Sequence, residues 1–229
     1  MLKIAGYQKL TLLDFPGKLA ATIFLPGCNF RCPFCHNSEL FSPTEIYDEN
    51  EILDMIKKRS SVIEGVAITG GEPTLSPELP DFMKKIKDMG LAVKLDTNGY
   101  NPDNLKSIVE AGLADYVAMD IKSSRERYSE VAGLPILDIS HIESSVDFLM
   151  NGKLPFEFRT TVVPELFADE DFVSIGKWIA GDEPYFLQGY VDSEMVLNRG
   201  FSQPTASLME HVKSLVLPFV PNTQIRGVE

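Results

Sequence analysis

Short apolar segments alternate with amphipathic ones along this chain, and that alternation restricts its fold more than any other feature. The apolar segments contain β-branched and aromatic residues and have the length of strands, at residues 19–25, 65–69, 92–96, 116–120, 156–163 and 184–188. Helical patterns with one apolar face lie at residues 51–59, 77–89, 104–111, 140–150, 169–180 and 205–216. Strands that alternate with helices predict an α/β fold, with a parallel sheet and helices outside it.

Chain length separates the architectures that this alternation allows. A closed barrel of eight strand–helix units typically needs about 250 residues, and this chain has 229. Six units therefore predict an open partial (β/α)6 barrel, with an open doubly wound sheet as the alternative. We expect a single domain over 1–229, with a hairpin-like lead-in at 1–18, a core barrel at 19–190 and a C-terminal helix and tail at 191–229.

Composition and charge exclude several classes of protein. The chain is 44% hydrophobic and 24% charged, as globular proteins are. Its net charge of −12 gives no general attraction to phosphate backbones, so we expect no nucleic-acid partner. No apolar run approaches the ~18 residues of a membrane span, and the first residues lack a signal-peptide pattern. We therefore expect a cytoplasmic protein without a membrane partner.

Glycines and polar residues gather where the predicted strands end. The carboxyl ends of parallel strands share one face of the sheet, so we expect these residues to converge on a site there. They are Gly70, Gly71, Glu72 and Pro73 after the second strand, Asp96 and Thr97 at the end of the third, Asp120 and Lys122 at the end of the fourth, Arg159 within the fifth and Gln188 at the end of the sixth.

The three cysteines of the chain all follow the first predicted strand. Cys28, Cys32 and Cys35 have C-x3-C-x2-C spacing, and three such thiolates can hold three irons of a 4Fe–4S cluster. The chain has no fourth cysteine, so one iron stays open to another ligand, as in a catalytic metal site. The alternative is structural zinc with His36 or a carboxylate as fourth ligand. Structural zinc usually draws paired ligands from separate hairpins, whereas these residues share one loop.

The segment FLPGCNFRCPFCHN, residues 24–37, resembles the signature of the radical S-adenosylmethionine (SAM) superfamily. More closely, it resembles the activating enzymes of glycyl-radical enzymes, among them the activators of pyruvate formate-lyase and of anaerobic ribonucleoside-triphosphate reductase. TLLDFPGK, residues 11–18, is most similar to the second subgroup. The resemblance extends from about Leu12 through the sixth predicted strand. It implies a radical SAM core fold with a 4Fe–4S cluster on the three cysteines.

The resemblance also implies roles around that cluster. Phe34, His36 and Asn37, which flank the last cysteine, are expected to line the cofactor site. Gly-Gly-Glu-Pro, residues 70–73, is expected to hold the amino group of SAM. For these four residues alone, an ordinary strand–helix turn with an exposed glutamate is the alternative.

Three further strand ends receive expectations from the same family. Asp120 is expected to meet the ribose and Lys122 the methionine carboxylate of SAM. A monovalent cation is expected on Asp96, Thr97 and Asp120, with a simple Asx-type turn as the alternative at the first two. Arg159 is expected to contact the carboxylate of the cofactor or the backbone of the substrate. The alternative for Arg159 is a salt bridge to a core acid such as Glu157 or Glu72. Gln188 lies near the position where some activators have a histidine that contacts the ribose.

The activity implied is reductive cleavage of SAM to methionine and a 5′-deoxyadenosyl radical, driven by an external reductant such as flavodoxin or ferredoxin. That radical takes a hydrogen atom from a glycine of a partner enzyme, such as anaerobic ribonucleoside-triphosphate reductase. One alternative is a radical SAM synthase acting on a small molecule. Another is a non-catalytic iron–sulfur electron carrier, which has no need of the Gly-Gly-Glu-Pro and Asp-x-Lys motifs.

Overall fold

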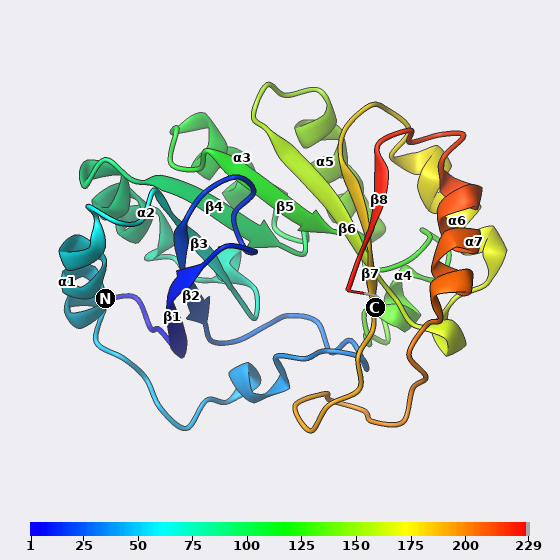
Figure 1. Ribbon diagram of the computed structural model, residues 1–229, viewed down its shortest axis with the longest axis horizontal. Coiled ribbons are helices and arrows are strands. Elements are labelled where there is room, and N and C mark those ends of the chain that lie inside the picture. The colour runs from blue at the N-terminus through cyan, green and yellow to red at the C-terminus, as the bar shows by residue number, and fades with distance from the viewer. Residues whose placement is uncertain (228–229) are drawn as a thin grey trace. The chain divides into compact units, whose positions relative to one another are not determined.

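A computed structural model describes residues 1–227 of the chain. Its eight strands follow one another across an open sheet in sequence order, from β1 to β8 (Figure 1). The chain divides into two compact units, and β5 (Tyr116–Asp120) begins in the first and ends in the second. No helix within 1–227 is both long enough and apolar enough to cross a membrane.

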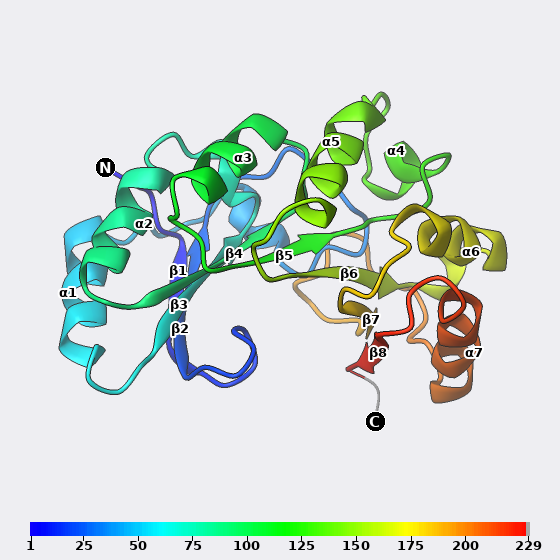
Figure 2. The same ribbon diagram turned by 90° about the horizontal axis from the view of Figure 1, so that it is seen from above.

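The first unit comprises Met1–Asn29 and Glu39–Ala118. Its strands are β1 (Gly6–Thr11), β2 (Ala20–Leu25), β3 (Gly65–Gly70) and β4 (Ala92–Thr97). β1 pairs antiparallel with β2, whereas β2, β3 and β4 pair in parallel. Its helices are α1 (Glu49–Arg59), α2 (Leu79–Asp88) and α3 (Pro102–Glu110), with short 3-10 turns η1 (Ser38–Phe41), shared with the second unit, and η2 (Pro73–Leu75). Figure 2 shows α2 and α3 on the same side of these strands.

Local chemistry accounts for where these helices begin and which faces they bury. The Asp48 carboxylate caps α1 by accepting from the backbone N–H groups of the next turn, at 2.8 and 3.3 Å. In α2 the buried residues Leu79, Phe82, Met83 and Ile86 have the spacing of one helical face. β2 and β3 are almost wholly buried, as expected for parallel strands covered by helices.

The second unit comprises Phe30–Ser38 and the described residues from Met119 onward. It holds the end of β5, with β6 (Phe156–Val162), β7 (Tyr185–Gly189) and β8 (Thr223–Arg226), and the pairs β6–β7 and β7–β8 are parallel. Its helices are α4 (Tyr128–Val131), α5 (Ile139–Met150), α6 (Asp169–Trp178) and α7 (Ala206–Val216), with the 3-10 turn η3 (Pro164–Leu166). α6 and α7 pack side by side (Figure 2).

The structure confirms the α/β class, the mostly parallel open sheet and the six predicted strands, which are β2 to β7. The predicted hairpin-like lead-in contains β1, which turns back onto β2. Besides the helix predicted for residues 191–229, the structure has β8 there, a strand that the sequence did not predict. β8 is only four residues long, and just Thr223 is buried, so its sequence carries no clear period-two signal. Residues 228–229 of that predicted tail lie outside the described residues.

Candidate cofactor site

The three cysteines of the cysteine segment, residues 24–37, are thiols and are not joined in disulfides. Cys32 is buried, and Cys28 and Cys35 are partly exposed. Cys28 belongs to the first unit, whereas Cys32 and Cys35 belong to the second. Three thiolates within eight residues form a donor set that suits an iron–sulfur cluster. Within 1–227 no group of three His, Cys, Asp or Glu residues is placed to hold a metal ion. Ligation of a cluster by the three cysteines therefore stays a prediction.

The two glycines at the end of β3 permit a close backbone approach within the first unit. Gly71 N–H donates to the Leu25 carbonyl at 2.9 Å, and Glu72 N–H donates to the Gly27 carbonyl at 2.8 Å. A Cβ on Gly71 would overlap the Gly27 carbonyl, and a Cβ on Gly70 would overlap the Leu25 backbone. The glycine pair therefore lets the end of β3 lie against the segment that leads into Cys28.

Glu72 lies inside the first unit, with a side chain only 1% exposed. One carboxylate oxygen accepts from the Thr74 hydroxyl at 2.5 Å and the Thr97 hydroxyl at 2.8 Å, and the other accepts from Asn98 N–H at 2.7 Å. Burial raises the pKa of Glu72. The structure thus corrects the alternative of an exposed glutamate in an ordinary turn. Glu72 joins the ends of β3 and β4, and its contact with the SAM amino group stays a prediction.

The end of β4 carries the residues predicted to bind a cation. Asp96 forms an ion pair with Lys94, whose side chain is 2% exposed. The Thr97 hydroxyl donates to Glu72 and accepts from Gly99 N–H at 3.1 Å. Both side chains therefore serve contacts within the chain. A cation on Asp96, Thr97 and Asp120 stays a prediction.

Sequence reasoning assigned no site role to Asn98, although its turn was noted. The Asn98 side-chain carbonyl accepts from Tyr100 N–H at 3.0 Å. Its amide nitrogen donates to the side-chain oxygen Oδ1 of Asn29 at 2.8 Å and lies 3.9 Å from the Cys28 sulfur. The Asx-turn pattern Asp-Thr-Asn-Gly was the only sequence signal for this arrangement. Asn98 therefore connects the end of β4 to the first cysteine.

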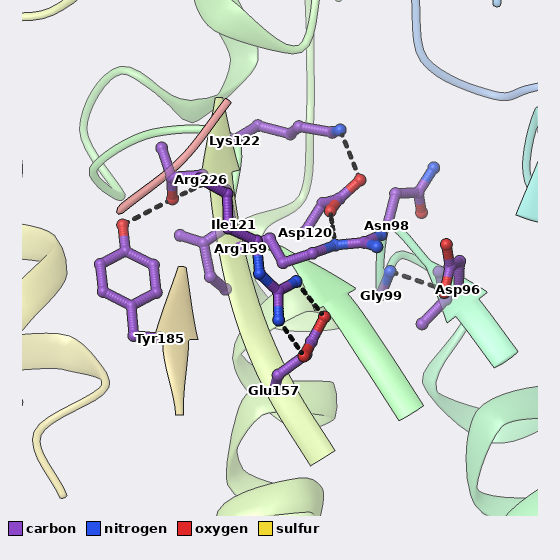
Figure 3. Close-up of polar contacts among 12 residues, drawn as sticks. Asp96, Asn98, Gly99, Asp120, Ile121, Lys122, Glu157, Arg159, Tyr185 and Arg226 are labelled. Carbon is purple, nitrogen blue, oxygen red and sulfur yellow. Dashed lines mark hydrogen bonds and ion pairs between the residues drawn. The ribbon is translucent and has the colours of Figure 1, made fainter. Parts of the chain in front are cut away.

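An ion cluster occupies the end of β5 in the second unit (Figure 3). The two carboxylate oxygens of Asp120 each lie 2.9 Å from a cation, one from Lys122 Nζ and the other from Arg159 Nε. Lys122 and Arg159 are both mostly buried, with exposed fractions of 17% and 14%. Arg159 of β6 thus pairs with an acid of β5, Asp120, which the sequence did not name as its partner. The cluster carries two positive charges and one negative.

Electrostatics hold Asp120 and Lys122 ionised. Burial alone would raise the pKa of Asp120, but the charges of Arg159 and Lys122 lower it to about 2. Burial alone would lower the pKa of Lys122, but the charges of Asp120 and Cys32 raise it. The net positive charge of the cluster is suited to a carboxylate ligand.

Residues 191–198, which follow β7, form hydrogen bonds with residues 33–36 of the cysteine segment. The sequence did not predict this contact. Leu197 N–H donates to the Cys35 carbonyl at 3.1 Å, and Asn198 N–H donates to the Pro33 carbonyl at 2.8 Å. His36 Nε2 forms a hydrogen bond with the Val191 carbonyl. These contacts bind residues 33–36 to residues 191–198 within the second unit.

The remaining predicted residues have simpler surroundings. Phe34 is buried, and Lys122 Nζ lies 6.0 Å from the centroid of its ring. Pro73 is buried at the start of η2. Asn37 is partly buried, and so is Gln188, which pairs in register with Arg226 of β8. The cofactor contacts assigned to these residues stay predictions.

Comparison with known proteins agrees with the cysteine segment and the fold. The family model described as the radical SAM superfamily matches residues 22–179. A Methanocaldococcus jannaschii protein, named provisionally as a glycyl-radical enzyme activating enzyme, is 28% identical, with 98% of this chain and 96% of that protein covered. The pyruvate formate-lyase-activating enzyme of Clostridium pasteurianum is 32% identical over 52% of each chain. SuiB of Streptococcus suis, at 11% identity, shares the fold with a TM-score of 0.70, over 88% of this chain and 47% of SuiB.

Proposed function

This chain belongs to the radical SAM superfamily, whose family model matches more than half of it, and we propose that it activates a glycyl-radical enzyme. The observation that carries the proposal is the similarity to a glycyl-radical enzyme activating enzyme along nearly the whole of both chains. Membership of the superfamily implies a 4Fe–4S cluster and SAM as cofactors. When bound, these two supply one-electron cleavage of a C–S bond in SAM, which yields methionine and a 5′-deoxyadenosyl radical.

The residues of the chain have distinct tasks in this proposal. Cys28, Cys32 and Cys35 hold the cluster as thiolates. Lys122 and Arg159, which share Asp120, attract the methionine carboxylate of SAM with their net positive charge. These groups bind and orient the cofactors, and none of them needs to transfer a proton.

The hydrogen donor in the proposal is a glycine Cα of a partner enzyme. The radical takes one hydrogen atom, which leaves 5′-deoxyadenosine and a glycyl radical. Anaerobic ribonucleoside-triphosphate reductase is the partner favoured by the segment TLLDFPGK. Flavodoxin or ferredoxin is the proposed source of the electron.

The TLLDFPGK segment forms the connection between β1 and β2, and its conformation is set by its own side chains. The Thr11 hydroxyl accepts from the N–H groups of Leu13 and Asp14, at 3.1 and 3.3 Å. The Asp14 carboxylate accepts from the Thr22 hydroxyl at 2.5 Å, and Phe15 is buried. The segment thus has a structural role in the first unit, and its link to one partner rests on the resemblance alone.

The proposal is tested by anaerobic reconstitution with iron and sulfide, followed by dithionite, SAM and the purified reductase. We expect about four irons and four sulfides per chain, and a glycyl radical seen as a doublet by electron paramagnetic resonance. Other glycyl-radical enzymes replace the reductase in parallel samples. Cleavage of SAM without a protein radical in any sample, together with hydrogen loss from a small molecule, would favour a synthase. Iron–sulfur assembly without SAM binding would favour an electron carrier.

A further inference from the structure

We propose that the Asn98 amide donates a hydrogen bond to the Cys28 sulfur in the cluster-bound protein and thereby raises the reduction potential of the cluster. Glu72 is the positioning residue that holds Asn98 in place. The inference rests on the proposed ligation of the cluster by Cys28. All of the residues that carry it lie in the first unit.

The contacts of Asn98 determine which end of its amide faces the cysteine. Its carbonyl oxygen accepts from Tyr100 N–H at 3.0 Å, so the amide nitrogen must point the other way. That nitrogen donates to the side-chain oxygen Oδ1 of Asn29 at 2.8 Å and lies 3.9 Å from Cys28 Sγ. An asparagine amide has two N–H groups, and one therefore serves Asn29 while the second faces the sulfur.

The backbone of Asn98 is held from the opposite side. Its N–H donates to Glu72 at 2.7 Å, and the same carboxylate accepts from the hydroxyls of Thr74 and Thr97. Glu72 is 1% exposed and Asn98 is 5% exposed. A buried carboxylate that accepts hydrogen bonds from three residues has little freedom to move, so the distance from Asn98 to Cys28 is set by the fold.

Ligation changes what the Cys28 sulfur requires. As a thiol it has a proton and lies 3.9 Å from the side-chain oxygen Oδ1 of Asn29, which can accept a hydrogen bond from it. As a metal-bound thiolate it has no proton and can only accept. The Asn98 N–H is the donor in place for it. A donor at a ligating sulfur stabilises the electron added on reduction, which makes the cluster easier to reduce.

The test compares Asn98→Ala and Asn98→Asp with the unchanged protein after anaerobic reconstitution. The readout is the midpoint potential, from a redox titration followed by electron paramagnetic resonance. For Asn98→Ala we expect the equilibrium to shift about tenfold toward the oxidised cluster, a fall of ~59 mV for a one-electron couple. Asn98→Asp should shift it further, because a negative charge then faces the sulfur. Glu72→Gln should lower the potential by less than Asn98→Ala.

Asn104→Ala is the matched control. The Asn104 amide donates to the Thr74 carbonyl at 2.9 Å, so the control loses a comparable hydrogen bond in the same unit without facing a cysteine. Its potential should equal that of the unchanged protein. In Asn98→Ser a hydroxyl on a shorter side chain replaces the amide as the hydrogen-bond donor. This variant is used in place of Asn98→Ala if the alanine variant does not assemble a cluster. We expect its potential to lie between those of the unchanged protein and Asn98→Asp.

Iron and sulfide analysis separates this inference from the proposed function. If the unchanged protein assembles no cluster, the proposed function fails. If it assembles one and cleaves SAM, but the Asn98 variants keep the potential of Asn104→Ala at equal iron content, then the inference about Asn98 is overturned and the proposed function stands.

Discussion

At the scale of single residues, position 71 requires glycine because the backbone of Gly27 lies too close for a side chain. A methyl group there would overlap the Gly27 carbonyl, next to Cys28. We expect Gly71→Ala to lower the free energy of unfolding by ~1–3 kcal/mol through overpacking and to reduce iron uptake. Urea denaturation and iron analysis measure the two effects. Gly6→Ala is the control, since its added Cβ meets nothing closer than 3.8 Å. Equal effects of the two substitutions would contradict this account.

Lys122 is expected to bind SAM without holding the cluster. Removing its ammonium in Lys122→Ala should weaken SAM binding about ten- to a hundredfold, the value of one charge-assisted hydrogen bond. Iron content should stay nearly unchanged. Equilibrium binding of SAM to the reconstituted protein measures the effect. Lys177→Ala is the control, because the Lys177 ammonium lies over the ring of Phe219 in the same unit. Unaltered SAM affinity in Lys122→Ala would remove Lys122 from the proposed site.

The ion cluster around Asp120 also predicts how stability depends on pH. The pKa of Asp120 is about 2 in the folded chain, below the ~3.9 of an unfolded aspartate. A lowered pKa stabilises the fold above the unfolded value, and that stability is lost as pH falls from about 4 toward 2. Urea titrations of the metal-free protein at pH 5 and pH 3 measure how much the free energy of unfolding falls between these two pH values. This fall should be smaller for Asp120→Asn than for the unchanged chain. The same loss in both proteins would contradict the prediction.

At the scale of elements, β8, which pairs with β7, also contacts β6 through an ion pair that the sequence did not indicate. Arg226 of β8 donates to Glu157 of β6 at 3.1 and 3.3 Å, and Glu157 is 1% exposed (Figure 3). Arg226→Ala removes the guanidinium that faces the buried Glu157 carboxylate, and breaking a fully buried ion pair costs about 3–5 kcal/mol. Arg226 is itself partly exposed, so we expect a loss of ~2 kcal/mol.

Chemical denaturation measures this loss, and Lys84→Ala provides the comparison. Lys84 forms an exposed ion pair with Asp88 within α2, so its removal should change stability by less than ~1 kcal/mol. The double variant Arg226→Ala with Glu157→Gln should recover part of the loss, because no buried charge then remains. No recovery in the double variant would show that Arg226 acts through its packing on Phe186 instead.

The elements that the sequence predicted are those with strong local patterns. Gly65–Gly70 and Phe156–Val162 are buried apolar strands, and their type follows from composition and length alone. β8 lacks such a pattern, and its pairing with β7 is a tertiary effect. The acid facing Arg159 also escaped prediction, because spacing within one strand does not identify the neighbour on the next. Asn98 was missed since its contact depends on how a turn is oriented.

At the scale of the whole molecule, the predictions about fold class and family are the most secure. They rest on the alternation of strand-like and helix-like segments along the chain, and on a cysteine spacing with few alternative explanations. The single predicted domain stays a prediction, because the chain divides into two compact units while the matched family range crosses both. The partner and reductant are matters of association, and a single chain carries little information about them.

The measurement that tests the central claim most directly is transfer of deuterium from a labelled glycine. The partner enzyme is produced with deuterium at its glycine Cα, mixed with the reconstituted protein, SAM and dithionite, and the 5′-deoxyadenosine is analysed by mass spectrometry. We predict one deuterium in 5′-deoxyadenosine. The protein radical should show a doublet with the unlabelled partner, due to the remaining α-hydrogen, and this splitting should collapse with the labelled partner, whose remaining α-position carries deuterium. Unlabelled 5′-deoxyadenosine from every glycyl-radical partner tested, with no protein radical, would contradict the claim.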